Sequence, residues 1–228
     1  LAKKQRKTLK KVKGLNKKRI LVITDSLGLP RKDSSGNIGL DNTWPYILRN
    51  EYEVFQISLL GETIKNLFDK SLPYSDSYFD YIIIQSGIVD CSPRAISKRE
   101  KYLIENIPFA GRIFYPLLKK YKIKLREKRD ITYTKIEDYK KYIINFKETF
   151  KTSKLIFISI LPANNEYEKI VPGIQKNILL YNACLKSYAP NLIEYDLELD
   201  NIYTSDLHHL NVKGNYFLYN KVKSKLND

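Results

Sequence analysis

The chain has 228 residues but few of the residue types that build metal or disulfide sites: two cysteines, two histidines and no methionine. Two cysteines are too few for the disulfide framework of a small secreted protein. We expect Cys91 and Cys184 to be small buried hydrophobic residues. No cysteine cluster or HExxH pattern suggests zinc. The sequence therefore predicts neither a metal site nor a cofactor.

Long apolar runs are also missing. No run approaches the roughly 20 residues needed to cross a bilayer. The N-terminus is basic and lacks the apolar segment of a secretory signal. These absences predict a cytoplasmic protein. Because the chain starts at Leu1 and contains no methionine, a segment upstream of it stays open.

Positive charge is plentiful but unevenly spread. The net charge is +15, and residues 1–19 carry ten Lys or Arg and no acid. We interpret residues 1–18 as a basic N-terminal arm and residues 19–228 as one domain. Such an arm is either solvated or binds an anionic surface, which would place the protein at the inner membrane face. Nucleic acid is disfavoured as a partner, because no helix-turn-helix, zinc-finger or RNP-like pattern is present.

Short apolar runs alternate with helical patterns along residues 19–228. Runs rich in β-branched residues predict five strands, at residues 19–23, 53–58, 80–85, 154–162 and 192–199. Apolar steps of three and four predict helices near residues 136–150, 174–188 and 218–226, and another begins at Asn42 or Thr43 before Pro45. Strands separated by helices predict a three-layer α/β/α domain with a five-stranded parallel sheet.

Residues 95–134 do not fit this alternation. The segment is long and basic, and we interpret it as an insertion of one or two helices. One reading is a solvated basic face over a few core anchors. The other is a lid or an element that grips the substrate beside the active site.

Polar residues follow the predicted strands, where parallel sheets place their ligand sites. Ser26 follows the first strand, Gly61 the second, Gly87 the third, and Asp206 and His209 the fifth. A serine nucleophile needs a base, and the base needs an orienting carboxylate. Ser26, His209 and Asp206 supply these three groups, and a loop glycine such as Gly61 can offer a backbone N–H to an oxyanion.

These blocks resemble the SGNH, or GDSL, hydrolases. The usual first block Gly-Asp-Ser-Leu is here Thr24-Asp25-Ser26-Leu27, and LLGET holds the glycine of the second. The third block is Gly87-Ile88-Val89-Asp90 instead of Gly-x-Asn-Asp. The last is Asp206-Leu207-His208-His209. The resemblance implies a flavodoxin-like fold, His209 as the base, and His208 either in solvent or lining the pocket.

The third block departs from the family pattern. Val89 replaces the asparagine that normally donates its amide to the oxyanion, and one such donor is worth about 10²–10³ in rate. Arg94 is a candidate substitute, or else forms a structural salt bridge with Asp90 or another carboxylate. The N–H groups of Ser26 and Gly61 alone are a second solution, and impaired activity is a third. We expect Asp25, Gly87, Asp90 and His208 on the substrate side of the site.

The resemblance implies a serine esterase or an O-acyltransferase. The variant GIVDCxPR resembles bacterial members associated with surface-polysaccharide production, so the expected substrate is an acylated carbohydrate or another small ester. The alternative is a non-catalytic module on the same scaffold, binding a glycan or an anionic partner, with Val89 marking lost activity.

Overall fold

The computed structural model describes residues 17–34, 36–195 and 201–228. The predicted basic arm falls almost entirely outside these ranges and stays a prediction.

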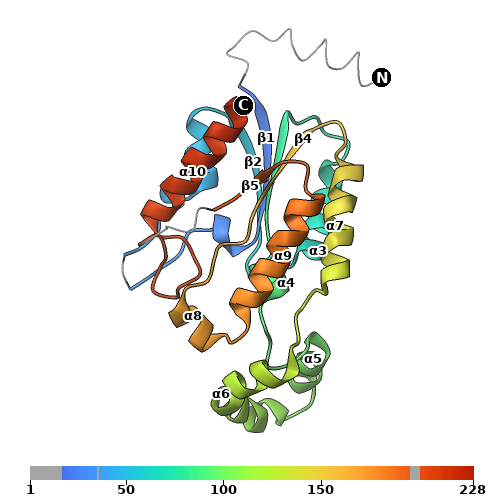
Figure 1. The fold of residues 1–228 in the computed structure, drawn as a ribbon, viewed down its shortest axis with the longest axis vertical. Coiled ribbons are helices and arrows are strands. Elements are labelled where there is room, and N and C mark those ends of the chain that lie inside the picture. Colours follow the sequence, from blue (N-terminus) through green and yellow to red (C-terminus); the bar gives the residue numbers. More distant parts are fainter. Residues whose placement is uncertain (1–16, 35, 196–200) are drawn as a thin grey trace.

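Five parallel strands form a single sheet among the described residues (Figure 1). They are β1 (Arg19–Thr24), β2 (Glu53–Ser58), β3 (Tyr81–Gln85), β4 (Lys154–Ile158) and β5 (Leu192–Ile193). Their order is β2-β1-β3-β4-β5. This is the flavodoxin-like order, in which ligands bind beyond the carboxyl ends of the strands near β1 and β3. The predicted fold class is confirmed.

Two predicted strands are shorter than expected. β4 ends at Ile158, although the apolar run continues to Leu161, whose side chain is buried in a loop. β5 has only two residues, and the rest of its predicted range enters the undescribed residues 196–200. An apolar run marks buried residues, and it does not distinguish a strand from a buried loop that follows it. The run can therefore extend beyond the last hydrogen bond of the sheet.

Helices cover both faces of the sheet, and each face has its own core. On one face α3 (Ile64–Ser71), α7 (Ile136–Thr149) and α9 (Ile174–Tyr188) pack against alternate strand residues such as Leu21 and Ile23. On the other, α2 (Trp44–Ile47) and α10 (Val212–Asn227) pack against Ile20 and Val22. This alternation follows the two-residue period of a strand. The helices predicted near residues 43, 136–150 and 174–188 and at the C-terminus are confirmed.

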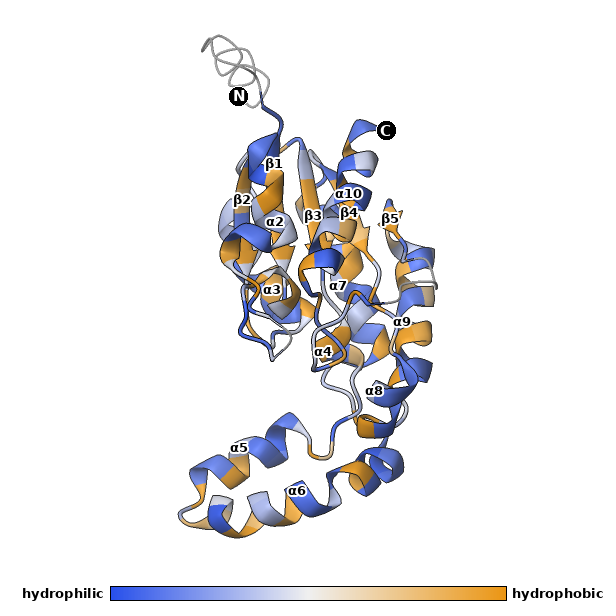
Figure 2. Cartoon of the chain, turned by 90° about the vertical axis from the view of Figure 1, so that its left-hand side faces the viewer, coloured by the Kyte–Doolittle hydropathy of each residue, from blue (hydrophilic) through white to orange (hydrophobic). Residues whose placement is uncertain are grey.

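The segment predicted as an insertion contains two helices, α5 (Lys98–Asn106) and α6 (Ala110–Arg129). They form a helical hairpin that projects from the body of the domain (Figures 1 and 2). No residue of α5 is buried, and Ala110 is the one buried residue of α6. The base of the hairpin is closed by a bridge between Arg94 and Ile131. Two shorter helices, α4 (Ile88–Cys91) and α8 (Asn165–Ile170), lie near this end of the sheet.

Candidate functional site

Ser26 sits in a tight turn directly after β1. Oδ1 of Asp25 accepts a hydrogen bond from the N–H of Leu27 at 3.0 Å, which caps the short 3-10 turn that carries Ser26. The hydroxyl of Thr24 lies 2.7 Å from that of Ser58 on β2. The threonine that replaces the usual glycine is therefore buried and joins two strands at the point where the site begins.

The loop before α10 holds the other two side chains of the predicted triad. It is closed by a bridge between Tyr203 and Leu210 and by a 2.9 Å hydrogen bond from the N–H of Thr204 to the carbonyl of His209. Asn211 ends it by capping α10, with its side chain accepting from the N–H of Gly214. The loop therefore presents His209 from a rigid frame.

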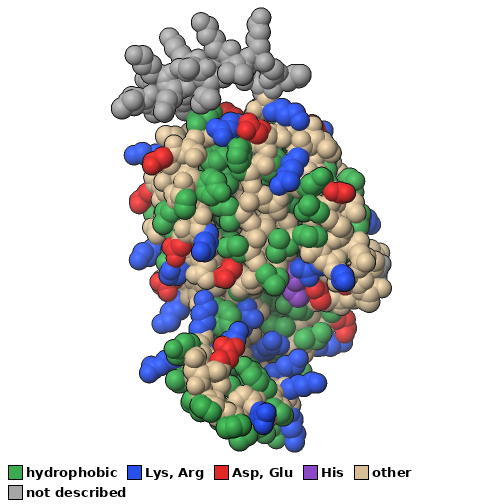
Figure 3. Space-filling view, turned by 180° about the vertical axis from the view of Figure 1, so that it is seen from behind, with side chains coloured by type: hydrophobic (Ala, Val, Ile, Leu, Met, Phe, Trp, Pro, Cys, Tyr) green, Lys and Arg blue, Asp and Glu red, His purple; other side chains and the backbone are tan. Residues whose placement is uncertain are grey.

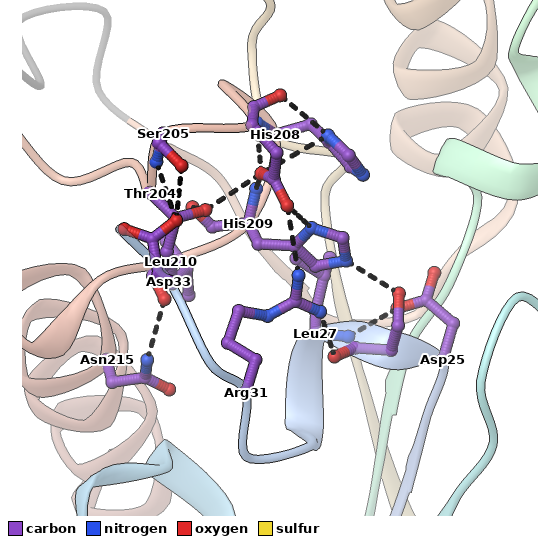
Figure 4. A network of polar contacts seen from close by, with 12 residues as sticks. Asp25, Leu27, Arg31, Asp33, Thr204, Ser205, His208, His209, Leu210 and Asn215 are labelled. Atoms are coloured by element: carbon purple, nitrogen blue, oxygen red, sulfur yellow. Dashed lines mark hydrogen bonds and ion pairs between the residues drawn. The ribbon is translucent and has the colours of Figure 1, made fainter. Parts of the chain in front are cut away.

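Ser26, His209 and Asp206 meet beyond the carboxyl end of β1, and Figure 4 shows His209 near Arg31 and the turn of Asp25 and Leu27. Oγ of Ser26 lies 2.8 Å from Nε2 of His209, and Nδ1 of His209 lies 2.7 Å from Oδ2 of Asp206. Both distances are those of good hydrogen bonds. Ser26 and His209 are 5% and 7% exposed, so the contact is largely shielded from water. The arrangement can move a proton from the serine hydroxyl to the imidazole.

Asp206 is held as a carboxylate. Oδ1 accepts hydrogen bonds from the hydroxyl of Thr204 and from the N–H groups of His208 and His209, at 2.8–3.2 Å. Burial alone would raise the pKa of Asp206, but the hydrogen bonds from His209 and Thr204 hold that pKa well below its usual range. The acid therefore stays ionised and accepts a hydrogen bond from Nδ1 of His209.

His209 is held as a neutral imidazole. The pKa of His209 is lowered to about 4, mainly by burial; the hydrogen bond with Asp206 opposes the decrease, and the nearby His208 and Arg31 add to it. A base must be unprotonated to accept the serine proton. His209 meets that condition at neutral pH.

Arg31 is a member of the site that the sequence did not reveal. Its guanidinium donates to Oδ2 of Asp206 at 3.0 Å and to the carbonyl of Ser26 at 3.4 Å (Figure 4). It thereby links the nucleophile turn to the acid. Arg31 lies in a loop, paired with Ile38 across a short bridge, and its partner is 175 residues away. Neither helical nor strand periodicity marks such a position.

The predicted oxyanion residues lie in the neighbouring loops. Gly61 has a φ of +67°, a left-handed conformation that glycine adopts without strain. Arg94 donates to the carbonyl of Val89 at 3.0 Å, and its guanidinium stacks 4.3 Å from the centre of the Tyr133 ring. Among the ion pairs of the described ranges, none joins Arg94 to Asp90. Arg94 therefore supports the third-block loop, and its part in the oxyanion site stays a prediction.

Asp25, Gly87 and Asp90, which we expect on the substrate side of the site, are all buried, and their contact with the substrate stays a prediction. Asp25 and Asp90 are 0% exposed, and both oxygens of Asp90 accept from the N–H of Ile64 at the start of α3. Gly87 has a φ of +135°, and a Cβ there would lie 2.5 Å from Ile160. These residues build the floor of the site.

Burial acts on both of these acids. It raises the pKa of Asp25 to about 7, and Oδ2 of Asp25 has no hydrogen-bond partner. It also raises the pKa of Asp90 to about 6, against hydrogen bonds from Thr134, Ile64 and Ser86 that lower it. Ionised Asp25 is therefore costly to the folded chain.

His208 lies at the rim. Its ring stacks on Tyr167 of α8, with the centroids 5.1 Å apart, and Nδ1 lies 2.9 Å from the carbonyl of Asp206. The side chain is 28% exposed and lines a cavity of about 10 Å³. The other lining residues are mostly apolar: Ile88, Leu161, Pro162, Ala163, Tyr167, Ile178 and Leu207. Of the two predicted placements, His208 adopts the one that lines a pocket.

Asp206, His208 and His209 also form a group of potential metal ligands, with one ligand atom from each within 4.8 Å of the others. Two of those atoms, Nδ1 of His209 and Oδ2 of Asp206, already bind one another. A metal bound there would break the contact that orients His209. The residues fit a proton relay better than a metal centre.

No protein-family model and no curated protein matches the sequence. Solved structures do match the fold. A lipase/acylhydrolase from Enterococcus faecalis is 12% identical, with a TM-score of 0.59 over 92% of this chain and 95% of that one. A lipolytic protein of the G-D-S-L family from Veillonella parvula is 12% identical, with a TM-score of 0.54 over 90% and 96% of the two chains. An alpha/beta hydrolase enzyme from the metagenome of Lake Arreo is 15% identical, with a TM-score of 0.52 over 91% and 94%.

Proposed function

We propose that this chain, which has the fold of the GDSL or SGNH hydrolases, is a serine esterase. The observation that carries the proposal is the hydrogen-bonded series from Oγ of Ser26 through His209 to Asp206, with distances of 2.8 and 2.7 Å. Hydrolysis of an ester needs a nucleophile, a base and an orienting acid in this order. The structures similar to this chain, which include a lipase/acylhydrolase, agree with this chemistry.

In the proposed reaction, Oγ of Ser26 attacks the ester carbonyl while Nε2 of His209 takes the serine proton. The tetrahedral intermediate collapses, and His209 returns the proton to the leaving alcohol. Water, activated by the same imidazole, then attacks the acyl-serine and releases the carboxylic acid. If a second alcohol attacks instead, the acyl group is transferred. Asp206 orients His209 and stabilises its charged form throughout.

The proposed oxyanion donors are the backbone N–H groups of Ser26 and Gly61. Backbone donors cost no reorganisation at the moment of reaction. Val89 offers no side-chain donor, so the oxyanion would rest on these backbone groups. An ester with a good leaving group demands least from such a site.

The proposed substrate carries a short acyl group, with an O-acetylated carbohydrate of bacterial surface polysaccharide as the candidate. We assign the acyl group to the apolar cavity that His208 lines, and its volume of about 10 Å³, close to that of one water molecule, favours a short chain. The bulky side chains of Leu161 and Tyr167 bound this cavity. An acetyl methyl fits such a space, whereas a longer chain would have to displace these side chains.

Activity through Ser26 is tested with p-nitrophenyl acetate. Wild type is expected to hydrolyse it, and Ser26→Ala is expected to lose at least about 10³-fold in kcat, the scale on which triad members act. Ser205→Ala, at an exposed serine in the loop before α10, is the matched control. Equal rates in wild type and Ser26→Ala would overturn the proposal.

A fluorophosphonate probe gives an independent reading. It should add its mass to Ser26 in the wild type, and His209→Ala should slow labelling because the hydroxyl loses its base. Labelling elsewhere, with Ser26 unmodified, would contradict the assignment of the nucleophile.

The substrate class has its own test. The rate with p-nitrophenyl acetate should exceed that with p-nitrophenyl octanoate by about tenfold or more, since a pocket that excludes several methylenes loses their binding energy. Acetate release from an O-acetylated oligosaccharide, measured alongside, tests the carbohydrate. A preference for octanoate would exclude the short-acyl assignment and leave the triad intact.

Val89 supports one rival, a glycan-binding module without turnover. Binding of an O-acetylated oligosaccharide by calorimetry, together with an inert Ser26, would favour it. Turnover that depends on Ser26 excludes it.

A further inference from the structure

The helical hairpin, residues 98–129, combines exposed apolar side chains with positive charge. It holds eleven Lys or Arg and three acidic residues. Ten of its large apolar side chains are at least 41% exposed: Tyr102, Leu103, Ile107, Phe109, Ile113, Phe114, Tyr115, Leu117, Tyr121 and Ile123. A concentration of this kind on a projecting element marks an interaction surface.

Five apolar residues of α6 share one face. Phe114, Leu117, Leu118, Tyr121 and Leu125 follow steps of three, one, three and four, which place them along one stripe of a helix. Lys120, Lys122 and Lys124 flank this stripe. Long lysine stems can lie along an apolar surface while their ammonium groups remain in water. The helix therefore has the pattern of one that lies in a lipid interface.

The tip of the hairpin continues this apolar surface. Phe109 is the most exposed aromatic side chain there, at 70%, and has a left-handed φ of 62°. Beside it an open hollow of about 620 Å³ is lined by residues that include Ile107, Arg112 and Tyr115. Figure 3 shows apolar side chains gathered on the hairpin, with Lys and Arg around them.

The hairpin emerges at the same end of the domain as the triad. Arg126 of α6 donates to the carbonyl of Ile170 in α8 at 2.7 Å. Tyr167, also in α8, stacks on His208 at the rim of the site. A surface that holds the hairpin would therefore also lie near the mouth of the site.

We propose that the helical hairpin docks the protein onto an anionic lipid bilayer, with the apolar face of α6 and Phe109 entering the interface and the flanking lysines binding the headgroups. The charge and the exposed apolar side chains of the hairpin favour lipid over a second copy of the chain or water alone. A second copy docking through the same hairpin would face eight like charges, the excess of basic over acidic residues in that segment. A solvated face would not carry ten exposed large apolar side chains. Anionic lipid complements both the charge and the apolar stripe.

The first test is cosedimentation of the full chain with vesicles of phosphatidylglycerol and phosphatidylcholine, and with phosphatidylcholine alone. The variant Lys120→Glu, Lys122→Glu, Lys124→Glu should weaken binding to the anionic vesicles by about tenfold or more, because each basic residue near such a surface contributes about fivefold. The control is Lys151→Glu, Lys176→Glu, Lys213→Glu, which makes the same charge change at exposed positions of the body. Equal weakening in the two variants, or none in the hairpin variant, overturns the proposal.

The second test changes no charge. Phe109→Ser with Phe114→Ser should weaken binding by about tenfold or more, because each phenyl ring loses its burial in lipid. Phe109→Trp should show blue-shifted emission with anionic vesicles, against a constant signal from the buried Trp44. Unchanged binding by the double variant refutes insertion. The proposal is also refuted if the wild type forms a dimer and does not bind vesicles, and the double variant dissociates that dimer.

The tests of the docking proposal and of the esterase proposal are independent of one another. The hairpin variants should hydrolyse p-nitrophenyl acetate at the wild-type rate, since this soluble ester needs no membrane. Ser26→Ala should bind the vesicles as wild type does. Loss of docking would leave the esterase proposal intact, and loss of esterase activity would leave the docking proposal intact.

Discussion

At the scale of residues, the order of four short sequence blocks was enough to predict Ser26, Asp206 and His209 as a triad. Nothing in the sequence pointed to Arg31. Blocks at strand ends are visible because a parallel sheet brings those ends together. Arg31 lies five residues after Ser26 in a loop, where no period constrains side-chain direction. Its contact with Asp206 depends on how two loops far apart in the sequence approach one another. Such contacts between loops require coordinates.

Arg31 gives a pH-dependent prediction. Its positive charge opposes protonation of His209, whose pKa is lowered to about 4, first by burial, with Asp206 opposing and His208 and Arg31 adding to the decrease. In Arg31→Gln that pKa should rise, so the acid limb of the kcat/KM profile should move up by about one pH unit. The fall in activity at neutral pH should be about tenfold or less. Arg31→Lys, which keeps the charge, should hold the limb near the wild-type position.

The measurement is kcat/KM for p-nitrophenyl acetate from pH 4 to pH 8. A merely structural role for Arg31 would lower the rate at every pH and leave the acid limb in place. That result would remove Arg31 from the electrostatics of the site.

Asp25 gives a prediction about stability. Burial raises its pKa to about 7, from 3.8 when it is solvated. Between these values the folded chain binds more protons than the unfolded chain, so this group lowers stability as the pH rises from about 4 to about 7. Asp25→Asn keeps an acceptor for the N–H of Leu27 and removes the charge. It should raise the free energy of unfolding at pH 8 and have little effect near pH 4.

Urea unfolding of wild type and Asp25→Asn at pH 4.5 and pH 8 measures this difference. Asp80→Asn serves as a control for general charge effects, because Asp80 is a partly exposed carboxylate directly before β3, at the end of the sheet away from Asp25. A gain that is the same at both pH values would mean that titration of Asp25 is not its source.

At the scale of elements, long periodic segments were predictable and short ones were not. α7 and α9 were confirmed because several turns of apolar spacing define each. α4 has four residues and α8 six, too few for a period to be read. The two-residue β5 shows the same limit for strands. These short elements border the site, so its rim was less predictable than its centre.

The cap of α10 gives a prediction at this scale. The side chain of Asn211 accepts from the N–H of Gly214 and donates to the carbonyls of Asn201 and Tyr203. Asn211→Ala should lower the free energy of unfolding by about 1–2 kcal/mol. It should also reduce kcat, because the loop that holds His209 loses its fixed end. Asn220→Ala, at an exposed position of the same helix, should do neither.

Thermal unfolding and kcat for p-nitrophenyl acetate together check this prediction. Destabilisation with unchanged kcat would show that the loop keeps its shape without the cap.

At the scale of the molecule, the body and the hairpin are held together differently. The body has a packed core on each face of the sheet, whereas the hairpin contributes one buried residue, Ala110. The sequence predicted an insertion there but left its function open between a solvated face and a gripping element. None of the helices in the described ranges is long and apolar enough to cross a membrane.

This difference predicts that the hairpin is dispensable for folding. Replacing residues 98–129 with a short Gly-Ser linker should change the Tm by only a few degrees, because Arg94 and Ile131 already bring the two ends together. Hydrolysis of p-nitrophenyl acetate should persist while vesicle binding falls. Calorimetry measures the Tm, and a large decrease in it would show that the hairpin stabilises the body.

The distance along the chain between Ser26 and His209, 183 residues, also has a consequence for biosynthesis. The nascent polypeptide therefore has its nucleophile in the open long before it has its base. Ester cleavage must therefore wait until the loop that carries His209 has been synthesised and has docked on a sheet whose five strands all precede it in the chain.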